Sequence, residues 1–284
     1  KQGVELSYEK YLRGNKGIKF IQKDRFNRDI GSYNNGNNDV NSLAGSDLTI
    51  TIDSELQEYG ELLMSNKKGA IVAIEPESGE ILSLVSGISY DPNLLVGRDK
   101  SKNYSNLIKD SIFSPLIDKG LLSTFPAGSP FKIIVGLIAL EEKIINKNSI
   151  ISCNGSYIYG KNKKSMKCHC GGGNHNIYSA ISNSCNSFFA EVYRKTINKN
   201  GNISENYDKW SKTVKSFGLG KFLNNDFPIG KKGMIPDSDF YDKWYPDFKW
   251  GALTTLSNSI GQGEILVTPI QLANMMSAVA NKGY

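Results

Sequence analysis

The sequence has no long apolar run, which limits the class of protein it can belong to. The longest such run, from Ile133 to Leu140, is far shorter than the about 20 residues that span a bilayer, so a membrane-embedded class is excluded for the residues given. The start has no initiator Met and no signal-like apolar stretch. We therefore expect a piece of a longer chain, with any membrane anchor upstream.

The chain also has only a small excess of positive over negative charge. The chain has 34 Lys and Arg against 28 Asp and Glu, and a net charge of +6 does not by itself predict a nucleic-acid partner. What is present is apolar content: 39% of the residues are hydrophobic, which excludes a disordered class. The length of 284 residues fits one large domain with an appendage, or two domains.

Residues 1–47 are polar, rich in Gly, Asn and Lys, and show no core of their own, so we expect the end of an upstream domain and a linker there. Residues 48–284 have the patterns of one domain. The predicted fold is α+β, an antiparallel sheet covered by helices. We expect strands at 48–52, 69–74 and 80–86, and helices at 53–66, 130–143, 176–196, 207–217 and 269–281.

Ser129 and Lys132 open the apolar helix as a Ser-x-x-Lys motif. A serine before Pro130 is an ordinary helix start, but a lysine three residues later is not, because a cation is unfavourable at the positive end of the helix dipole. The apolar residues after Lys132 predict a buried amine with a lowered pKa, which is a general base for a serine on the same helical face. The same spacing at Ser7/Lys10 and Ser65/Lys68 lies in polar surroundings and reads as solvated surface.

A second motif, Ser-x-Asn, lies inside an apolar pattern at Ser184 and Asn186. These residues are either hydrogen-bonded helix-end groups or site residues. In the second case Ser184 relays a proton and Asn186 holds the lysine and donates to a substrate amide. Together with Ser129 and Lys132 they form two of the three motifs of serine acyl-transfer enzymes that react with penicillin; the third, Lys-Thr-Gly, is absent.

The motifs together resemble the transpeptidase domain of class B penicillin-binding proteins. The resemblance is strongest to the elongation-type members, penicillin-binding protein 2, in a form similar to that of Bacteroidetes-like bacteria. The resemblance covers nearly the whole chain and rests on residues 126–132, 184–186, 259–263 and 267–273, with further matches at 8–14, 74–81 and 90–93.

The resemblance implies a periplasmic D,D-transpeptidase, anchored in the inner membrane by an upstream segment and preceded by a non-catalytic pedestal. It implies that Ser129 attacks the D-Ala-D-Ala bond of a peptidoglycan stem peptide, that Lys132 takes the serine proton, and that Ser184 passes it to the departing D-Ala. An amine from a second stem peptide then resolves the acyl-enzyme, and β-lactams trap it. The implied partner is an elongation-complex glycosyltransferase of the SEDS type; no nucleic acid is expected.

The resemblance also implies a substrate-binding segment at Gly261, Gln262 and Gly263, although these glycines also fit a bare turn before a helix. In the family the Lys-Thr-Gly strand follows the last helix, and it supplies half of the oxyanion hole. We therefore expect this stretch alone to acylate poorly. The alternatives are a β-lactamase or D,D-carboxypeptidase of the same fold, for which no deacylating group is evident, and a non-catalytic wall-binding scaffold.

The four cysteines and two histidines all lie within 33 residues. Zinc is one interpretation, with Cys168, Cys170 and His175 as candidate ligands, since thiolate and imidazole are its preferred donors. The spacing Cys-His-Cys is not that of a zinc knuckle, so a disulfide from Cys153 to Cys168 or Cys170, or free thiols, is favoured over zinc, and Cys185 is expected to be buried and free. No cofactor is otherwise predicted.

Overall fold

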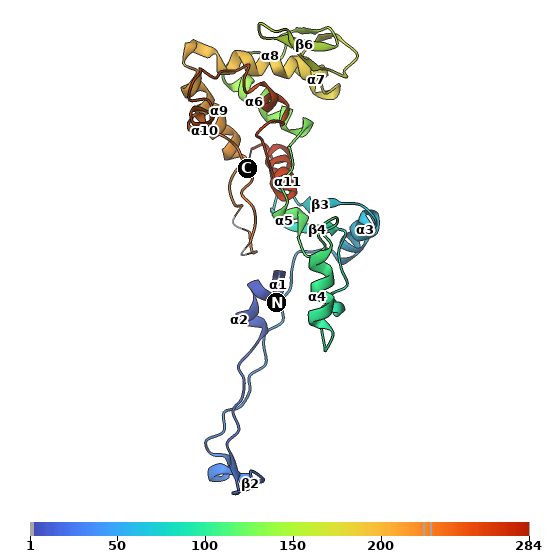
Figure 1. Ribbon diagram of the computed structural model, residues 1–284, viewed down its shortest axis with the longest axis vertical. Coiled ribbons are helices and arrows are strands. Elements are labelled where there is room, and N and C mark those ends of the chain that lie inside the picture. The colour runs from blue at the N-terminus through green and yellow to red at the C-terminus, as the bar shows by residue number, and fades with distance from the viewer. Residues whose placement is uncertain (1–2, 224, 228, 284) are drawn as a thin grey trace. The chain divides into compact units, whose positions relative to one another are not determined.

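The computed structural model describes residues 3–223, 225–227 and 229–283. The described chain divides into two compact units, one formed by residues 3–51 with 225–227 and the other by residues 52–223 with 229–283. Figure 1 shows the elements of both.

The first unit consists of short elements without a core. It contains α1 (Gly3–Ser7), α2 (Glu9–Leu12), the antiparallel pair β1 (Ile21–Lys23) and β2 (Asp29–Ser32), and the turn η1 (Tyr33–Gly36). None of its described residues is buried. Its structure therefore rests on backbone pairing rather than on a packed interior, as the polar composition predicts.

The second unit begins with a helix on a two-stranded hairpin. Helix α3 (Ser54–Met64) is capped by Asp53, whose carboxylate accepts from the Leu56 N–H at 2.9 Å. Strands β3 (Gly69–Ile74) and β4 (Ile81–Gly87) pair antiparallel, as predicted, and α3 packs on β4. The α+β fold is thus present, although residues 48–52, predicted as a strand, form none. β-Branched propensity favours a strand there, but residues 48–52 belong to none of the sheets in the described part of the chain.

The helices that follow carry the core. The bounds of the helices and turns are η2 (Pro92–Leu95), α4 (Lys100–Lys109), α5 (Lys119–Leu122), η3 (Ser129–Phe131), α6 (Lys132–Glu141), α7 (Ile177–Ser182), α8 (Asn186–Ile197), η4 (Lys199–Gly201), α9 (Ile203–Ser216), α10 (Ser238–Trp244), η5 (Leu256–Ile260) and α11 (Pro269–Ala280). Helix α6 packs against α7, α8, α9 and η5, so it lies at the centre of the helical layer.

The core is aromatic around one tryptophan. Trp210 is buried and lies within 6 Å of the rings of Phe131, Tyr193 and Tyr207. Burial of rings of this size dominates the stabilisation of a helical layer. Because Phe131 precedes Lys132 directly, this packing also fixes the start of α6.

Two small two-stranded sheets lie beside α8. Strand β5 (Ile151–Cys153) pairs with β8 (Gly173–His175), and β6 (Ser156–Tyr159) pairs with β7 (Lys164–Lys167). Strands β5, β6 and β7 all pack on α8, and Figure 1 shows β6 beside α8 and α7. None of the helices in the described part of the chain has the length and apolar content needed to cross a bilayer.

Candidate active site

Ser129 lies at the start of a helix whose entry is set by a glycine. Gly128 has φ +66° and ψ −158°, a conformation that side chains with a Cβ avoid. Its N–H donates to the Gly261 carbonyl at 2.8 Å, and the Phe131 N–H donates back to the Gly128 carbonyl at 3.0 Å. The sequence predicts Ser129 as an N-cap; instead it is the first residue of the turn η3, and its side chain is exposed.

Lys132, one turn further on, is buried beneath that serine. Its side chain is 2% exposed, and Nζ donates to the Ser184 hydroxyl at 2.8 Å, to the Ser184 carbonyl at 2.8 Å and to Asn186 Oδ1 at 2.6 Å. Burial lowers the pKa of Lys132, and the neighbouring Cys168, Cys185 and Cys170 partly offset this effect. The amine is therefore shifted toward the neutral form that can act as a base.

Ser184 stands between the lysine and the first serine. Its hydroxyl donates to Ser129 Oγ at 2.9 Å while it accepts from Lys132. The expected direct contact between Lys132 and Ser129 is not among the hydrogen bonds of the described residues. Hydrogen bonds therefore connect Ser129 to the amine through the Ser184 hydroxyl, because that oxygen lies within hydrogen-bond distance of both.

The position of Ser184 depends on an unfavourable backbone conformation. The predicted helix at 176–196 is interrupted here: the N–H groups of Ser184 and Cys185 donate to the carbonyls of Ile181 and Ala180, which ends α7 in a Schellman motif. The residue at this point of the motif is usually Gly, yet Ser184 occupies it with φ +50°. A non-glycine residue costs about 1 kcal/mol there. In return, both the hydroxyl and the carbonyl of Ser184 face Lys132.

Asn186 begins α8 and joins three parts of the site. Its Oδ1 accepts from Lys132, its Nδ2 donates to the Lys167 carbonyl at 2.8 Å, and its backbone N–H donates to Cys168 Sγ at 3.1 Å. The side chain is half-buried. Asn186 thus holds the lysine, as predicted, and ties it to the end of β7.

Of the predicted substrate-binding residues, Gly261 packs against the Ser129 loop, whereas Gln262 and Gly263 lie in the turn that follows it. Gly261 has φ +65°, and a Cβ there would meet the Gly128 carbonyl oxygen at 2.6 Å, so only glycine allows this close approach. Gln262 and Gly263 are exposed in the following turn. Gly261 therefore packs closely against the backbone of Gly128 and accepts a hydrogen bond from its N–H, which holds the loop that leads into Ser129.

Sequence reasoning missed the network that holds this glycine turn. The Asn258 side chain is fully buried and lies 2.9 and 2.8 Å from the hydroxyls of Tyr207 and Tyr241, and with its amide turned to satisfy both atoms it also donates to the Gln262 carbonyl at 3.0 Å. Tyr241 donates to Glu264 at 2.9 Å. The partners come from α9 and α10, so no local signal in the sequence identifies them.

The four cysteines form one cluster beside Asn186. The Sγ atoms of Cys153, Cys168, Cys170 and Cys185 all lie within 4.8 Å of one another, and all four are free thiols. Of the two alternatives favoured over zinc, the structure has the free thiols, and no disulfide joins Cys153 to Cys168 or Cys170. Cys185 is buried as expected but has thiol neighbours. Spacing along the sequence could not show this, because β5, the turn after β7 and the α7–α8 link supply the thiols.

The cluster fits a tetrahedral zinc centre. With Zn–S bonds of about 2.3 Å, ligand sulfurs lie about 3.8 Å apart; here Cys168 is 3.3 Å from Cys170 and 3.7 Å from Cys185, and Cys170 is 3.5 Å from Cys153. Burial favours the neutral thiol of Cys168, but backbone hydrogen bonds from Ser187 and Cys170 outweigh it and lower the pKa to about 6. His175 Nε2 lies 3.4 Å from Cys170 Sγ, outside the four-thiol set.

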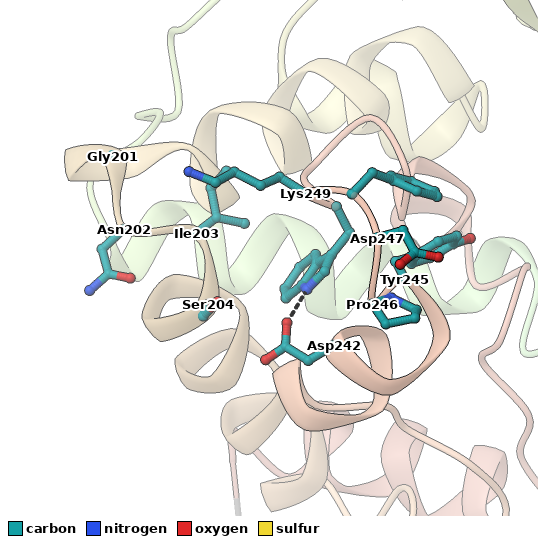
Figure 2. A pocket seen from close by; sticks show the side chains of 11 residues that line it. Gly201, Asn202, Ile203, Ser204, Asp242, Tyr245, Pro246, Asp247 and Lys249 are labelled. Carbon is teal, nitrogen blue, oxygen red and sulfur yellow. Dashed lines mark hydrogen bonds between the residues drawn. The ribbon is translucent and has the colours of Figure 1, made fainter.

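A separate cavity of about 640 Å³ lies at the beginning of α9, and Asn202, Ile203, Tyr245 and Trp250 are among the residues that line it. Figure 2 shows this cavity from close by. Trp250 is 7% exposed and donates to Asp242 at 2.6 Å, whereas Trp244 is 68% exposed. Neither Lys132 nor any of the three polar residues around it, Ser129, Ser184 and Asn186, lines this cavity. Trp250 is thus a core residue and Trp244 a surface residue, and the cavity is separate from the site of the acyl-transfer motifs.

Comparison with known proteins agrees with this geometry. The model of the penicillin binding protein transpeptidase domain matches residues 69–284. Peptidoglycan D,D-transpeptidase MrdA of Acinetobacter baumannii is 32% identical over 100% of this chain and 40% of its own length, and that of Escherichia coli K12 is 29% identical over 100% and 43%. The chain thus spans about two fifths of the length of these curated relatives.

Solved structures show the same fold. The Helicobacter pylori penicillin-binding protein PBP2, in complex with MreC, matches with a TM-score of 0.83 and 28% identity over 99% of this chain and 50% of that one. Pseudomonas aeruginosa PBP2, in complex with WCK 5153, matches with a TM-score of 0.80 and 30% identity over 100% and 56%. With a buried lysine, two serines and an asparagine assembled on this α+β fold, the chain belongs to the penicillin-binding protein transpeptidase family.

Proposed function

We propose that the protein is a peptidoglycan D,D-transpeptidase of the elongation type, which cross-links stem peptides through an acyl-enzyme on Ser129. The observation that carries the proposal is the continuous chain of hydrogen bonds from Ser129 through Ser184 to the buried Lys132. A serine hydroxyl is a weak nucleophile until a base takes its proton. This arrangement supplies the base, the route and an open position for the nucleophile.

The proposed reaction has two halves. In the first, Ser129 Oγ attacks the carbonyl of the D-Ala-D-Ala bond, its proton passes to Ser184 as Ser184 gives its own to Lys132, and the reverse path protonates the departing D-Ala amine. In the second, an amine of another stem peptide attacks the ester, and the Ser129–acyl bond breaks. Asn186 holds the lysine throughout. We also propose the Ser129 backbone N–H as one of the donors that stabilise the oxyanion.

The hydrolase alternatives need a group that activates water against the ester. Among the described residues, no hydrogen bond joins a carboxylate to Ser129, Ser184 or Lys132; their partners are one another and Asn186. This favours a long-lived acyl-enzyme, which an amine resolves and which a β-lactam traps. The Mycobacterium tuberculosis penicillin-binding protein A, 25% identical over 84% of this chain with a TM-score of 0.70, has been solved as an imipenem acyl-enzyme.

The proposal extends to location and partners. We infer a periplasmic enzyme with an upstream inner-membrane anchor, with residues 1–47 as the end of a pedestal and 48–284 as the transpeptidase domain. The unit boundary after Thr51 and the family match from Gly69 support this division. The complex of Helicobacter pylori PBP2 with MreC supports partners in the elongation machinery, and a glycosyltransferase of the SEDS type is the proposed one.

Mapping the acylated residue tests the function. The protein, as its own cells make it, is incubated with fluorescent penicillin, digested and analysed by mass spectrometry. We expect one adduct, on the peptide that contains Ser129, and slow release of the label. Adduct on another serine, or release of the label within seconds through hydrolysis, contradicts the transpeptidase assignment.

We propose in addition that the four-thiol cluster holds one structural zinc ion. Zinc there would cross-link β5, the turn after β7 and the α7–α8 link, and so fix the Cys168 thiolate that accepts from the Asn186 N–H. Structural zinc contributes directly to folding free energy. Its proposed role is to hold Asn186 in place, and no proton transfer passes through it.

Metal analysis checks the zinc proposal. After dialysis against metal-free buffer, we expect about one zinc per chain by mass spectrometry, and a lower melting temperature after treatment with a strong chelator. Replacing Cys168 and Cys185 by Ser should remove the metal, whereas replacing the exposed Ser182 by Ala should not. Metal-free protein whose four thiols all react with a thiol reagent under native conditions would contradict the proposal.

A further inference from the structure

The net positive charge of the chain is concentrated in one segment. Residues 143–190 contain six lysines and no Asp or Glu, and this segment alone accounts for the net charge of +6. The other 28 Lys and Arg balance the 28 Asp and Glu of the remaining chain. The lysines are Lys143, Lys147, Lys161, Lys163, Lys164 and Lys167.

Four of these lysines lie on one hairpin. Lys161 and Lys163 form the turn between β6 and β7, and Lys164 and Lys167 are the ends of β7. All four are exposed, and none appears among the ion pairs of the described residues. Uncompensated lysines on a short rigid element produce a positive local field.

The acidic residues on either side of the segment cannot neutralise this field. Glu142 pairs with Lys199 at 2.9 Å and also with Lys209, and Glu191 pairs with Arg194 at 2.8 Å and Lys195 at 3.5 Å. Both carboxylates are therefore already occupied by cations from α8, η4 and α9. The lysines of the β6–β7 hairpin are left for a ligand from outside.

The hairpin is fixed at the edge of the candidate active site. The Lys167 carbonyl accepts from Asn186 Nδ2 at 2.8 Å, and the Tyr157 hydroxyl on β6 donates to Glu191 on α8 at 2.7 Å. Lys164 and Lys167 lie three residues apart on β7, about 10 Å at a rise of about 3.3 Å per residue, so Lys164 and the turn lie farther than Lys167 from the asparagine that holds Lys132. Figure 1 shows β6 beside α8.

We propose that the β6–β7 hairpin binds the carboxylates of the acidic peptide that resolves the acyl-enzyme. This inference rests on the proposed function, which requires a second peptide to approach an acyl group on Ser129. Lysine heads recognise carboxylates as flexible point charges, and several of them on one fixed hairpin steer an anionic peptide toward the edge of the site. The first peptide reacts at Ser129 itself and does not need the hairpin.

The test separates acylation from transfer. In the protein as its own cells make it, Lys161, Lys163 and Lys164 are replaced together by Gln; the matched control replaces three exposed lysines of α4, Lys100, Lys102 and Lys109. The acyl-enzyme is offered an acceptor peptide with free carboxylates or the same peptide with amidated carboxylates. We expect the hairpin variant to raise the KM for the acidic acceptor about tenfold at low salt, with kcat unchanged.

Further measurements distinguish a failure of the hairpin inference from a failure of the proposed function. The rate of penicillin acylation and the KM for the amidated acceptor should stay within about twofold of wild type, and high salt should remove the difference for the acidic acceptor. The inference is overturned if the KM for the acidic acceptor is unchanged in the hairpin variant, or if the KM rises equally for both acceptors. Lost binding to anionic lipid vesicles together with an unchanged KM would also overturn it, because the lysines would then serve a membrane surface. Absence of acylation in every form, wild type included, overturns the proposed function instead.

Discussion

Replacing Ser129 by Ala is expected to abolish covalent labelling by penicillin while leaving the fold intact. The side chain is exposed and its described hydrogen bond is the one from Ser184, so its loss removes the nucleophile without opening a cavity in the core. No other hydroxyl can take over, because Ser184 lies deeper and is held by Lys132. The melting temperature should change by no more than about 2 °C.

The same motif elsewhere in the chain supplies the control. Ser65 also stands three residues before a lysine, but it is exposed and its hydroxyl donates to the Leu62 carbonyl. Ser65→Ala should label at the wild-type rate. Fluorescence of the labelled band after electrophoresis measures both variants, and substantial labelling of Ser129→Ala would show that another residue is the nucleophile.

Replacing Lys132 by Met should slow acylation at least about a thousandfold, because the general base is lost while a side chain of similar length still fills the buried space. The variant leaves the Ser184 hydroxyl and Asn186 Oδ1 without their amine partner, so some loss of stability is also expected. Lys68→Met removes an exposed amine at the corresponding motif position and should leave the rate unchanged. Stopped-flow acylation by penicillin measures both rates, and a fall of less than tenfold would exclude Lys132 as the base.

The pH dependence of acylation in the wild type follows from the same amine. Only the neutral form accepts a proton, so the rate should rise with pH and level off above the pKa of Lys132. Burial lowers that pKa below the ordinary 10.5, and negative charge on Cys168, Cys185 and Cys170 opposes the shift. The rise is therefore expected below pH 10.5 and should be absent from the slow residual reaction of Lys132→Met. A rate that falls with pH across this range would contradict the assignment.

The sequence alone determined much of the site. Ser129 and Lys132 lie three positions apart on one chain segment, so a helix start places the serine at the surface and the lysine beneath it. The α+β class followed in the same way from the periodicity of 53–66, 69–74 and 80–86. These features depend on residues close together in the sequence, so the spacing of polar and apolar residues is enough to predict them.

Only the tertiary structure decided how the parts meet. Ser184 lies between Lys132 and Ser129 because a Schellman turn breaks a helical pattern that reads as continuous from 176 to 196. The cysteine cluster is assembled from three segments that packing on α8 brings together. These contacts join residues that are far apart in the sequence. They depend on how distant helices and strands pack and on where their side chains point, which a local sequence pattern does not determine. The strand expected at 48–52 is not formed for a related reason, because β-branched propensity alone does not place a segment in a sheet.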